Sequence, residues 1–230
     1  MASGGVTELS IDLPHNGQVS ALLDWPEDAW SLYVLAHGAG AGMRHRFLES
    51  ITQALFVRGV ATLRYQFPYM EAGARRPDSP GVAEDTVQAA ASRAGDLAGG
   101  LPVIAGGKSF GGRMTSGAAA RALPGVRGLV FLGFPLHPPG KPAVQRADHL
   151  DGIHVPMLFL QGTRDQFAQL DLIRGVCGRL GPRATLQLID EGDHSFGVPK
   201  RTGRSSSEVI DELADGIVQW ARASGIGTPR

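Results

Sequence analysis

Ser109 lies at the centre of the pentapeptide Gly107-Lys108-Ser109-Phe110-Gly111, which fits the pattern G-x-S-x-G. In this pattern the serine occupies a sharp turn between a strand and a helix, where its hydroxyl can attack a carbonyl group. A chain with 32 glycines can match the pattern by chance, so the flanking residues must show whether the match is meaningful. An apolar segment at 101–105 comes before the motif, and a helix rich in small residues is predicted at 109–123. This context favours a nucleophilic serine.

The glycines around Ser109 suit a turn with a strained backbone. Gly106 and Gly107 come before the serine, and Gly111 and Gly112 follow it. The start of the following helix would direct N–H groups toward the site and favour a developing oxyanion. Alternatively, Ser109 only caps the helix and the glycines form an ordinary tight turn. The catalytic interpretation therefore requires partner residues.

A serine hydroxyl needs a general base, and the base needs a carboxylate that orients it. In a parallel sheet, functional side chains lie past the carboxyl ends of strands. Asp165 follows a predicted strand at 157–160, and His194 follows the last predicted strand, at 185–189. Asp190 and Asp193 are alternatives to Asp165, but both lie too close to His194 along the chain to reach around its ring easily. We predict that Ser109, His194 and Asp165 act as nucleophile, base and orienting acid.

Two backbone N–H groups should stabilise the oxyanion. The first candidate is the amide of Phe110, directly after the nucleophile. The second comes from the glycine-rich loop after the strand at 32–36, where Ala39 is the main candidate. Gly40 is the next candidate, and it is also a possible contact to substrate. His37 is predicted to brace this loop.

The elements that must position these residues alternate between strand and helix. Apolar segments typical of strands lie at 32–36, 60–67, 101–105, 126–134, 157–160 and 185–189. They are separated by helical patterns at 47–58, 82–97, 109–123 and 166–180, and a last helix is predicted at 207–222. Two alternating segments, 8–13 and 18–23, flank Asn16-Gly17 and predict an antiparallel hairpin. The sequence thus predicts an α/β fold in a single domain over 1–230, with about eight mostly parallel strands and helices on both faces.

Composition excludes several classes of function. Lys and Arg number 22, and Asp and Glu also number 22, so no positive excess is available for nucleic acid or an anionic membrane. The single cysteine, Cys177, cannot form an intrachain disulfide. No apolar run reaches the roughly 20 residues that span a bilayer, and Met1 to Gly5 lack the features of an export signal. We expect a cytoplasmic protein.

Cofactor and metal chemistry find little support in the sequence. The glycines at 38–42 resemble a nucleotide-binding loop, but Met43 replaces the third glycine of G-x-G-x-x-G and no acid ends the next strand. Asp193 and His194 lack a nearby third ligand at metal-binding spacing. We therefore expect no cofactor and no metal.

Taken together, the motifs resemble the α/β-hydrolase family over nearly the whole chain. The resemblance rests on His-Gly-Ala-Gly, Gly-Lys-Ser-Phe-Gly-Gly-Arg, Gly-Thr-Arg-Asp and Gly-Asp-His-Ser-Phe. It is strongest to the small, capless, dienelactone-hydrolase-like group. The elbow motif, Gly-Lys-Ser-Phe-Gly-Gly-Arg, and the histidine motif, Gly-Asp-His-Ser-Phe, are similar to the testis-expressed-protein-30-like branch. The resemblance implies an α/β-hydrolase fold and a serine hydrolase. A dienelactone hydrolase proper uses a cysteine nucleophile, whereas Cys177 lies in a predicted helix and is expected to be buried packing.

The resemblance also bears on the pocket. Larger family members carry a cap after the sixth strand, but here only about twenty residues, 135–155, are available. Lys108 stands where many esterases have histidine, and it is either exposed beside the turn that carries Ser109 or shapes an acid-side pocket. Arg113 forms a structural salt bridge or lies near the site. Tyr65 and Tyr69, after another strand, either line the cleft or pack.

The function that these observations favour is cleavage of small soluble carboxylic esters, or related acyl bonds, through an acyl-enzyme. An open site without a cap holds little of a long acyl chain, so small-molecule substrates are preferred to triglycerides. The alternative is a non-catalytic protein of the same fold that acts as an interaction partner.

Overall fold

The structure is a computed structural model, and it describes residues 5–14 and 17–227. One eight-stranded sheet runs through the molecule in the order β1-β2-β4-β3-β5-β6-β7-β8. The strands are β1 (Val6–Leu13), β2 (Gly17–Asp24), β3 (Ser31–Ala36), β4 (Val60–Tyr65), β5 (Val103–Lys108), β6 (Val126–Leu132), β7 (Met157–Gly162) and β8 (Ala184–Ile189). The six strands from β3 to β8 are parallel, and β1 and β2 are antiparallel at one edge.

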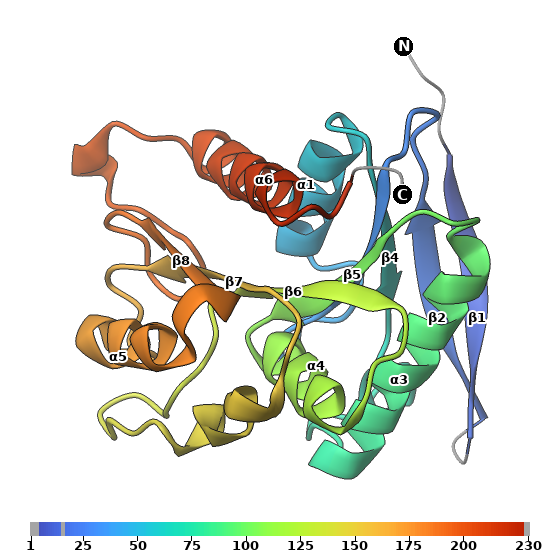
Figure 1. The fold of residues 1–230 in the computed structure, drawn as a ribbon, viewed down its shortest axis with the longest axis horizontal. Helices are drawn as coiled ribbons and strands as arrows, with labels where there is room; N and C mark the ends of the chain where they lie inside the picture. Colours follow the sequence, from blue (N-terminus) through green and yellow to red (C-terminus); the bar gives the residue numbers. More distant parts are fainter. Residues whose placement is uncertain (1–4, 15–16, 228–230) are drawn as a thin grey trace.

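Helices cover both faces of this sheet. They are α1 (Arg46–Phe56), α2 (Pro68–Glu71), α3 (Pro80–Leu97), α4 (Phe110–Arg121), α5 (Leu170–Leu180) and α6 (Ser206–Ala223), with short 3-10 turns η1 (Gln145–Gly152), η2 (Gly181–Arg183) and η3 (Lys200–Thr202). Figure 1 shows α1 and α6 on one face and α3, α4 and α5 on the other. The predicted architecture is confirmed.

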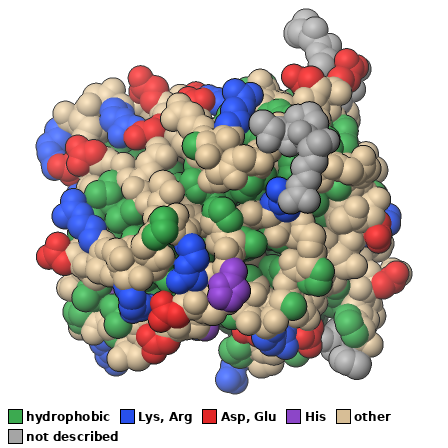
Figure 2. Space-filling model, viewed as in Figure 1, with side chains coloured by type: hydrophobic (Ala, Val, Ile, Leu, Met, Phe, Trp, Pro, Cys, Tyr) green, Lys and Arg blue, Asp and Glu red, His purple; other side chains and the backbone are tan. Residues whose placement is uncertain are grey.

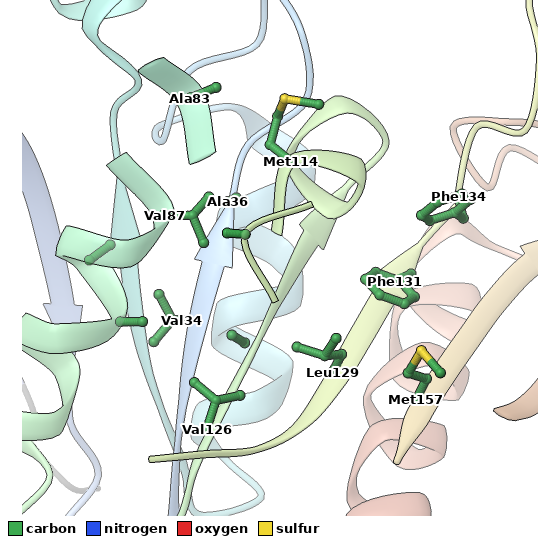
Figure 3. Close-up of a cluster of buried hydrophobic side chains, with 14 of the residues drawn as sticks. Val34, Ala36, Ala83, Val87, Met114, Val126, Leu129, Phe131, Phe134 and Met157 are labelled. Atoms are coloured by element: carbon green, nitrogen blue, oxygen red, sulfur yellow. The ribbon is translucent and has the colours of Figure 1, made fainter. Parts of the chain in front are cut away.

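The sheet is buried because its central strands are mostly apolar on both sides. Every residue of β3, β4, β5 and β7 is buried, as expected for parallel strands between two helical layers. One hydrophobic cluster lies under α3 and α4 and includes Val87, Met114 and Phe131 (Figure 3). A second lies under α1 and α6 and includes Leu48 and Leu213. Cys177 packs in the first cluster, as predicted.

Several element boundaries differ from the sequence prediction. Strand β5 continues through Gly106, Gly107 and Lys108, because these residues pair with β6 and bring Ser109 to the sheet edge. Helix α5 begins at Leu170, since the preceding residues form the turn that holds Asp165. The short helix α2 was not predicted. The hairpin β1–β2 forms, but His15 and Asn16 of its predicted turn lie outside the described residues.

The connection between β6 and β7 contains only η1 as a regular element, so no cap domain covers the sheet edge. No described helix is long and apolar enough to cross a membrane. Acidic and basic side chains are interspersed over the face seen in Figure 2, in keeping with the zero formal net charge of the chain.

Candidate active site

Ser109 occupies a strained turn between β5 and α4. Its φ of 49° and ψ of −111° lie in a region that non-glycine residues rarely adopt. Its amide donates to the carbonyl of Leu132 on β6 at 3.1 Å, and its own carbonyl accepts from Arg113 at 3.0 Å. The turn is thus fixed by the sheet on one side and by α4 on the other, and the hydroxyl projects from the carboxyl edge of the sheet.

His194 and Asp165 meet Ser109 at this edge. The Nε2 atom of His194 is 2.8 Å from Ser109 Oγ, and its Nδ1 atom is 2.7 Å from Asp165 Oδ2. An ionised carboxylate only accepts hydrogen bonds, so Nδ1 carries the ring proton and Nε2 is free to accept one from the serine. The structure brings together the three residues that the sequence predicted.

The carboxylate of Asp165 is fully buried but well supplied with donors. Its Oδ1 accepts from the amide of Phe167 at 2.8 Å, and its Oδ2 accepts from Gln161 Nε2 at 2.5 Å as well as from His194. Gln161 in turn accepts from the amide of Phe134. The ring of Phe167 lies against the imidazole, with centroids 4.3 Å apart. These contacts hold the carboxylate and the ring in one orientation.

Asp193 has a different role from Asp165. Its Oδ1 accepts from the amides of Ser195 and Gly197, both at 2.8 Å, and so closes the turn that carries His194. The choice of Asp165 over Asp193 as the partner of the imidazole therefore agrees with the geometry.

The two predicted oxyanion donors come from separate turns that lie close to each other. Phe110 is the first residue of α4, where an amide has no acceptor within the helix. The loop after β3 approaches the nucleophile closely, since a Cβ on Gly38 would lie 3.9 Å from Ser109 Cβ. In this loop the amide of Gly40 donates to the hydroxyl of Tyr69 at 2.9 Å. Gly40 is thus engaged elsewhere, which favours Ala39, an exposed residue, as the second donor.

His37 braces the same loop, as expected. Its Nε2 accepts from the amide of Phe67 at 3.1 Å, and its Nδ1 donates to the carbonyl of Gly38 at 2.8 Å. The side chain is completely buried, and this burial lowers the pKa of His37 to about 4, against an opposing effect of the Gly38 carbonyl. The ring is therefore neutral at pH 7.

The two tyrosines considered for the pocket are structural. Tyr65 is fully buried in the core beneath α3 and α4, so it has no accessible surface for substrate. Tyr69 is 4% exposed, and its hydroxyl is used to hold Gly40. Neither side chain forms an open wall of the cleft, because the strand end carries them inward.

Arg113 lies away from the three central residues. It lines a surface groove between α3, α4 and η1, together with Glu84, Arg146 and His149, and this groove includes none of the described residues Ser109, Asp165 and His194. Burial lowers the pKa of Arg113, and the neighbouring Arg146 adds to that effect. No ion pair of Arg113 is present among the described residues, so the salt-bridge alternative is not supported either.

Lys108 differs from both alternatives considered for it. It is only 9% exposed, and its Nζ donates to the backbone carbonyl of His194 at 2.6 Å. Sequence reasoning missed this contact and the role of Gln161. Gln161 carried a signal, since an amide at the end of an otherwise apolar strand needs a buried partner, whereas the contact of Lys108 spans 86 residues and leaves no local pattern.

A second groove, of about 950 Å³, lies between α1 and α6 and is bordered by Ser195 and Phe196, directly after His194. Its apolar lining includes Phe47 and the exposed Val57. Among the described residues, no group of three His, Cys, Asp or Glu side chains could hold a metal ion.

Known structures share the fold of this protein. A lidless α/β serine hydrolase from Xanthomonas campestris is 20% identical, with 96% of each chain covered and a TM-score of 0.74. Dienelactone hydrolase from Anabaena variabilis is 17% identical over 96% of this chain and 99% of that one, with a TM-score of 0.76. Est1E from Butyrivibrio proteoclasticus is 18% identical over 94% and 100%, with a TM-score of 0.68. These likenesses establish the shared fold.

The sequence pattern of one family covers most of the chain. The pattern that describes the alpha/beta hydrolase domain matches residues 30–222. This range runs from β3 to the last turn of α6 and contains Ser109, His194 and Asp165. The protein therefore belongs to the alpha/beta hydrolase family.

Proposed function

We propose that this protein is a serine hydrolase that cleaves small soluble carboxylic esters through an acyl-enzyme. The observation that carries the proposal is the continuous hydrogen-bond chain from Asp165 through His194 to Ser109, whose backbone is strained. Such strain costs free energy and persists where the surroundings impose it, frequently at functional sites. Family membership and the esterases among proteins of the same fold support the reaction class.

The reaction follows from the positions of the proton donors and acceptors. Ser109 Oγ attacks the ester carbonyl carbon while His194 Nε2 accepts the hydroxyl proton, and Asp165 stabilises the resulting imidazolium. When the carbonyl re-forms, the bond to the leaving oxygen breaks and His194 gives that oxygen the proton, which releases an alcohol. Water then attacks the acyl-enzyme by the same route, so a carboxylic acid leaves and Ser109 regains its proton.

The amides of Phe110 and Ala39 stabilise the negative charge on the carbonyl oxygen. Helix α4 adds the partial positive charge of its N-terminus to the Phe110 amide. Loss of one such donor typically lowers kcat by about 10²–10³. These donors are backbone groups, so the turns that hold them determine whether the site works.

Substrate size follows from the absence of a cap between β6 and β7. An open site surrounds little of a long acyl chain, so esters of short acids are favoured, with no cofactor required. A non-catalytic interaction role has no specific support, because an interaction surface does not need a serine hydrogen-bonded to a base and a buried acid.

The test is hydrolysis of 4-nitrophenyl acetate, butyrate and laurate by the parent protein, by Ser109→Ala and by Ser195→Ala. We expect Ser109→Ala to lower kcat by about 10⁴–10⁶, and Ser195→Ala, which removes an exposed hydroxyl beside the base, to change it little. Acetate and butyrate should be cleaved with higher kcat/KM than laurate. Hydrolysis by folded Ser109→Ala at the parent rate would refute the proposal.

A further inference from the structure

Lys108 is a buried cation directly before the nucleophile. It is the last residue of β5, and only 9% of its surface is exposed. Placing an ammonium group in such surroundings costs free energy unless it finds partners. Its partner is the main-chain carbonyl of His194, 2.6 Å from Nζ. The residue before the proposed nucleophile is thereby bonded to the backbone of the proposed base.

The geometry around Gly133 shows how closely Lys108 approaches the rest of the site. A Cβ on Gly133 would lie 3.1 Å from Lys108 Nζ, 3.4 Å from the His194 carbonyl oxygen and 3.6 Å from Asp165 Oδ2. The ammonium, the backbone of the base and the orienting carboxylate therefore meet around one residue. Gly133 leaves room for that meeting because it has no side chain, and its φ of +69° also favours glycine.

Aromatic rings shield the ammonium from solvent. The rings of Phe47 and Phe196 are stacked with centroids 5.7 Å apart, and Nζ lies 6.0 and 5.4 Å from them. These distances are within the range of cation–π attraction. Gly38, in the loop after β3, packs against the aliphatic stem. Lys108 thus links β5, the loop after β8, the start of α1 and the turn after β3.

The charged groups that face Lys108 are few. Asp165, from the turn after β7, and Asp193, from the turn after β8, both favour its charged form, and His194 faces it through its carbonyl. Phe47 on α1 and Gly38 after β3 present no charge. Burial outweighs the two carboxylates and lowers the pKa of Lys108 to about 8.

We propose that Lys108 is a positioning residue for the reaction: its ammonium tethers the backbone of His194 to the nucleophile strand and so sets the distance between Nε2 and Ser109 Oγ. The inference rests on the proposed function. A charged donor forms a shorter and stronger hydrogen bond than a neutral amine. The tether is therefore complete while Lys108 is protonated and weakens when the proton leaves. Small misplacements of reacting groups are costly, because an error of about 1 Å can lower the rate about 10²-fold.

The first part of the test compares the parent with Lys108→Met, which keeps the aliphatic stem but has no donor. Lys141→Met is the matched control, because Lys141 is exposed in the connection between β6 and β7. With 4-nitrophenyl acetate we expect Lys108→Met to lower kcat by about 10- to 100-fold with KM changed little. Lys141→Met should match the parent. Equal kcat for folded Lys108→Met and the parent would overturn the inference.

The second part uses pH and does not depend on the variant folding. Between pH 7 and 10 the parent's kcat/KM should fall with a midpoint near pH 8, because the tether weakens as the pKa of Lys108 is passed. Lys141→Met should show the same fall, and Lys108→Met, if it folds, should lack it. A flat parent profile over this range would overturn the inference.

Measurements of unfolding as a function of pH distinguish a fall in activity from a loss of structure. The pKa of Lys108 is about 8 in the folded protein and 10.5 for a free lysine, so between these values the unfolded chain binds more protons. By linkage, the contribution of Lys108 to the free energy of unfolding rises with pH over this window and is lost as pH falls toward 8. Parent stability relative to Lys108→Met should therefore increase where activity decreases. If activity and the stability of the parent relative to Lys108→Met both fell with rising pH, the result would contradict the tether.

Reaction with a fluorophosphonate probe distinguishes failure of this inference from failure of the proposed function. If the parent is labelled at Ser109 and Lys108→Met is labelled about 10-fold or more slowly, the tether is supported. If both are labelled at equal rates, the hydrolase proposal stands and the tether is refuted. If the folded parent is not labelled, the hydrolase proposal fails and the tether falls with it.

Discussion

Two glycine-rich turns carry Ser109 and the two proposed oxyanion donors, and their glycines serve different purposes. In the turn at 106–112, between β5 and α4, added side chains would collide with the backbone: a Cβ on Gly111 would lie 2.6 Å from the His37 carbonyl oxygen, and one on Gly112 would lie 2.7 Å from the Gly107 carbonyl oxygen. In the loop at 38–42, a Cβ on Gly40 would meet nothing within 4 Å, but its φ is +71°. The first turn needs glycine for space and the second for conformation.

The difference reflects two structural requirements of the site. The nucleophile turn must be rigid, because it holds Ser109 in a strained conformation, so β3, β5, β6 and α4 pack against it without room for side chains. The loop after β3 must leave an amide facing substrate, so it stays open and is held by single side-chain bonds from His37 and Tyr69. We expect changes in the first turn to cost more stability than changes in the second.

The largest effect is expected for Gly111→Ala. Its new methyl group would lie 2.6 Å from the His37 oxygen and 2.7 Å from Ala36 Cβ, so α4 would have to move away from β3. Overpacking of this kind typically costs about 1–3 kcal/mol, and more where backbone must shift. Urea unfolding with the parent alongside measures the cost. Unchanged stability would show that the turn is less tightly packed than the structure indicates.

His37 connects the two turns, and its titration gives the next effect. Its pKa is about 4 in the folded protein and 6.5 for a free histidine, so the unfolded chain binds more protons between these values. The stabilisation is complete above pH 6.5 and is lost as pH falls toward 4. Thermal unfolding from pH 7 to 4 should show a steeper loss for the parent than for His37→Asn.

Exposed His154 provides the control for this comparison. We expect His154→Asn to follow the parent curve at every pH. If His37→Asn also followed it, the buried neutral imidazole would not be the source of acid lability.

A smaller effect is expected for Gly40→Ala, the counterpart of Gly111→Ala in the open loop. There is space for the methyl group, and only the left-handed conformation is disfavoured, at about 1 kcal/mol. The variant should fold, with stability reduced by about that amount. A loss as large as that of Gly111→Ala would remove the distinction between the two turns.

The smallest effect is expected for Tyr69→Phe, which removes the hydroxyl that accepts from the Gly40 amide. One neutral hydrogen bond contributes about 1 kcal/mol, so we expect stability to fall by at most that amount and kcat to fall about threefold as the loop relaxes. Steady-state kinetics and urea unfolding on the same preparation measure both. An unchanged kcat would mean that this bond does not set the position of Ala39.

The sequence was informative where the role of a residue follows from its position directly after a strand. The elbow motif, the acid after β7 and the histidine after β8 follow strand ends, and a parallel sheet brings such ends to one edge, so Ser109, Asp165 and His194 could be predicted together. The alternation of apolar strands and helices likewise predicted the sheet and its two helical layers.

The sequence was uninformative where the role of a residue depends on the direction in which its side chain points. Tyr65 and Tyr69 lie next to a strand end, but the backbone turns both inward. Arg113, one helical turn after Ser109, faces η1. The bond from Lys108 to His194 joins residues that share no local pattern, because it depends on how the end of β5 packs against the loop after β8.

The most direct test of the central claim, that Ser109 is an activated nucleophile, is the intact mass of the protein after treatment with a fluorophosphonate probe. The account predicts one adduct per chain on the native parent, and none on folded Ser109→Ala or on heat-denatured parent. An unlabelled native parent, or equal labelling of Ser109→Ala, would contradict it.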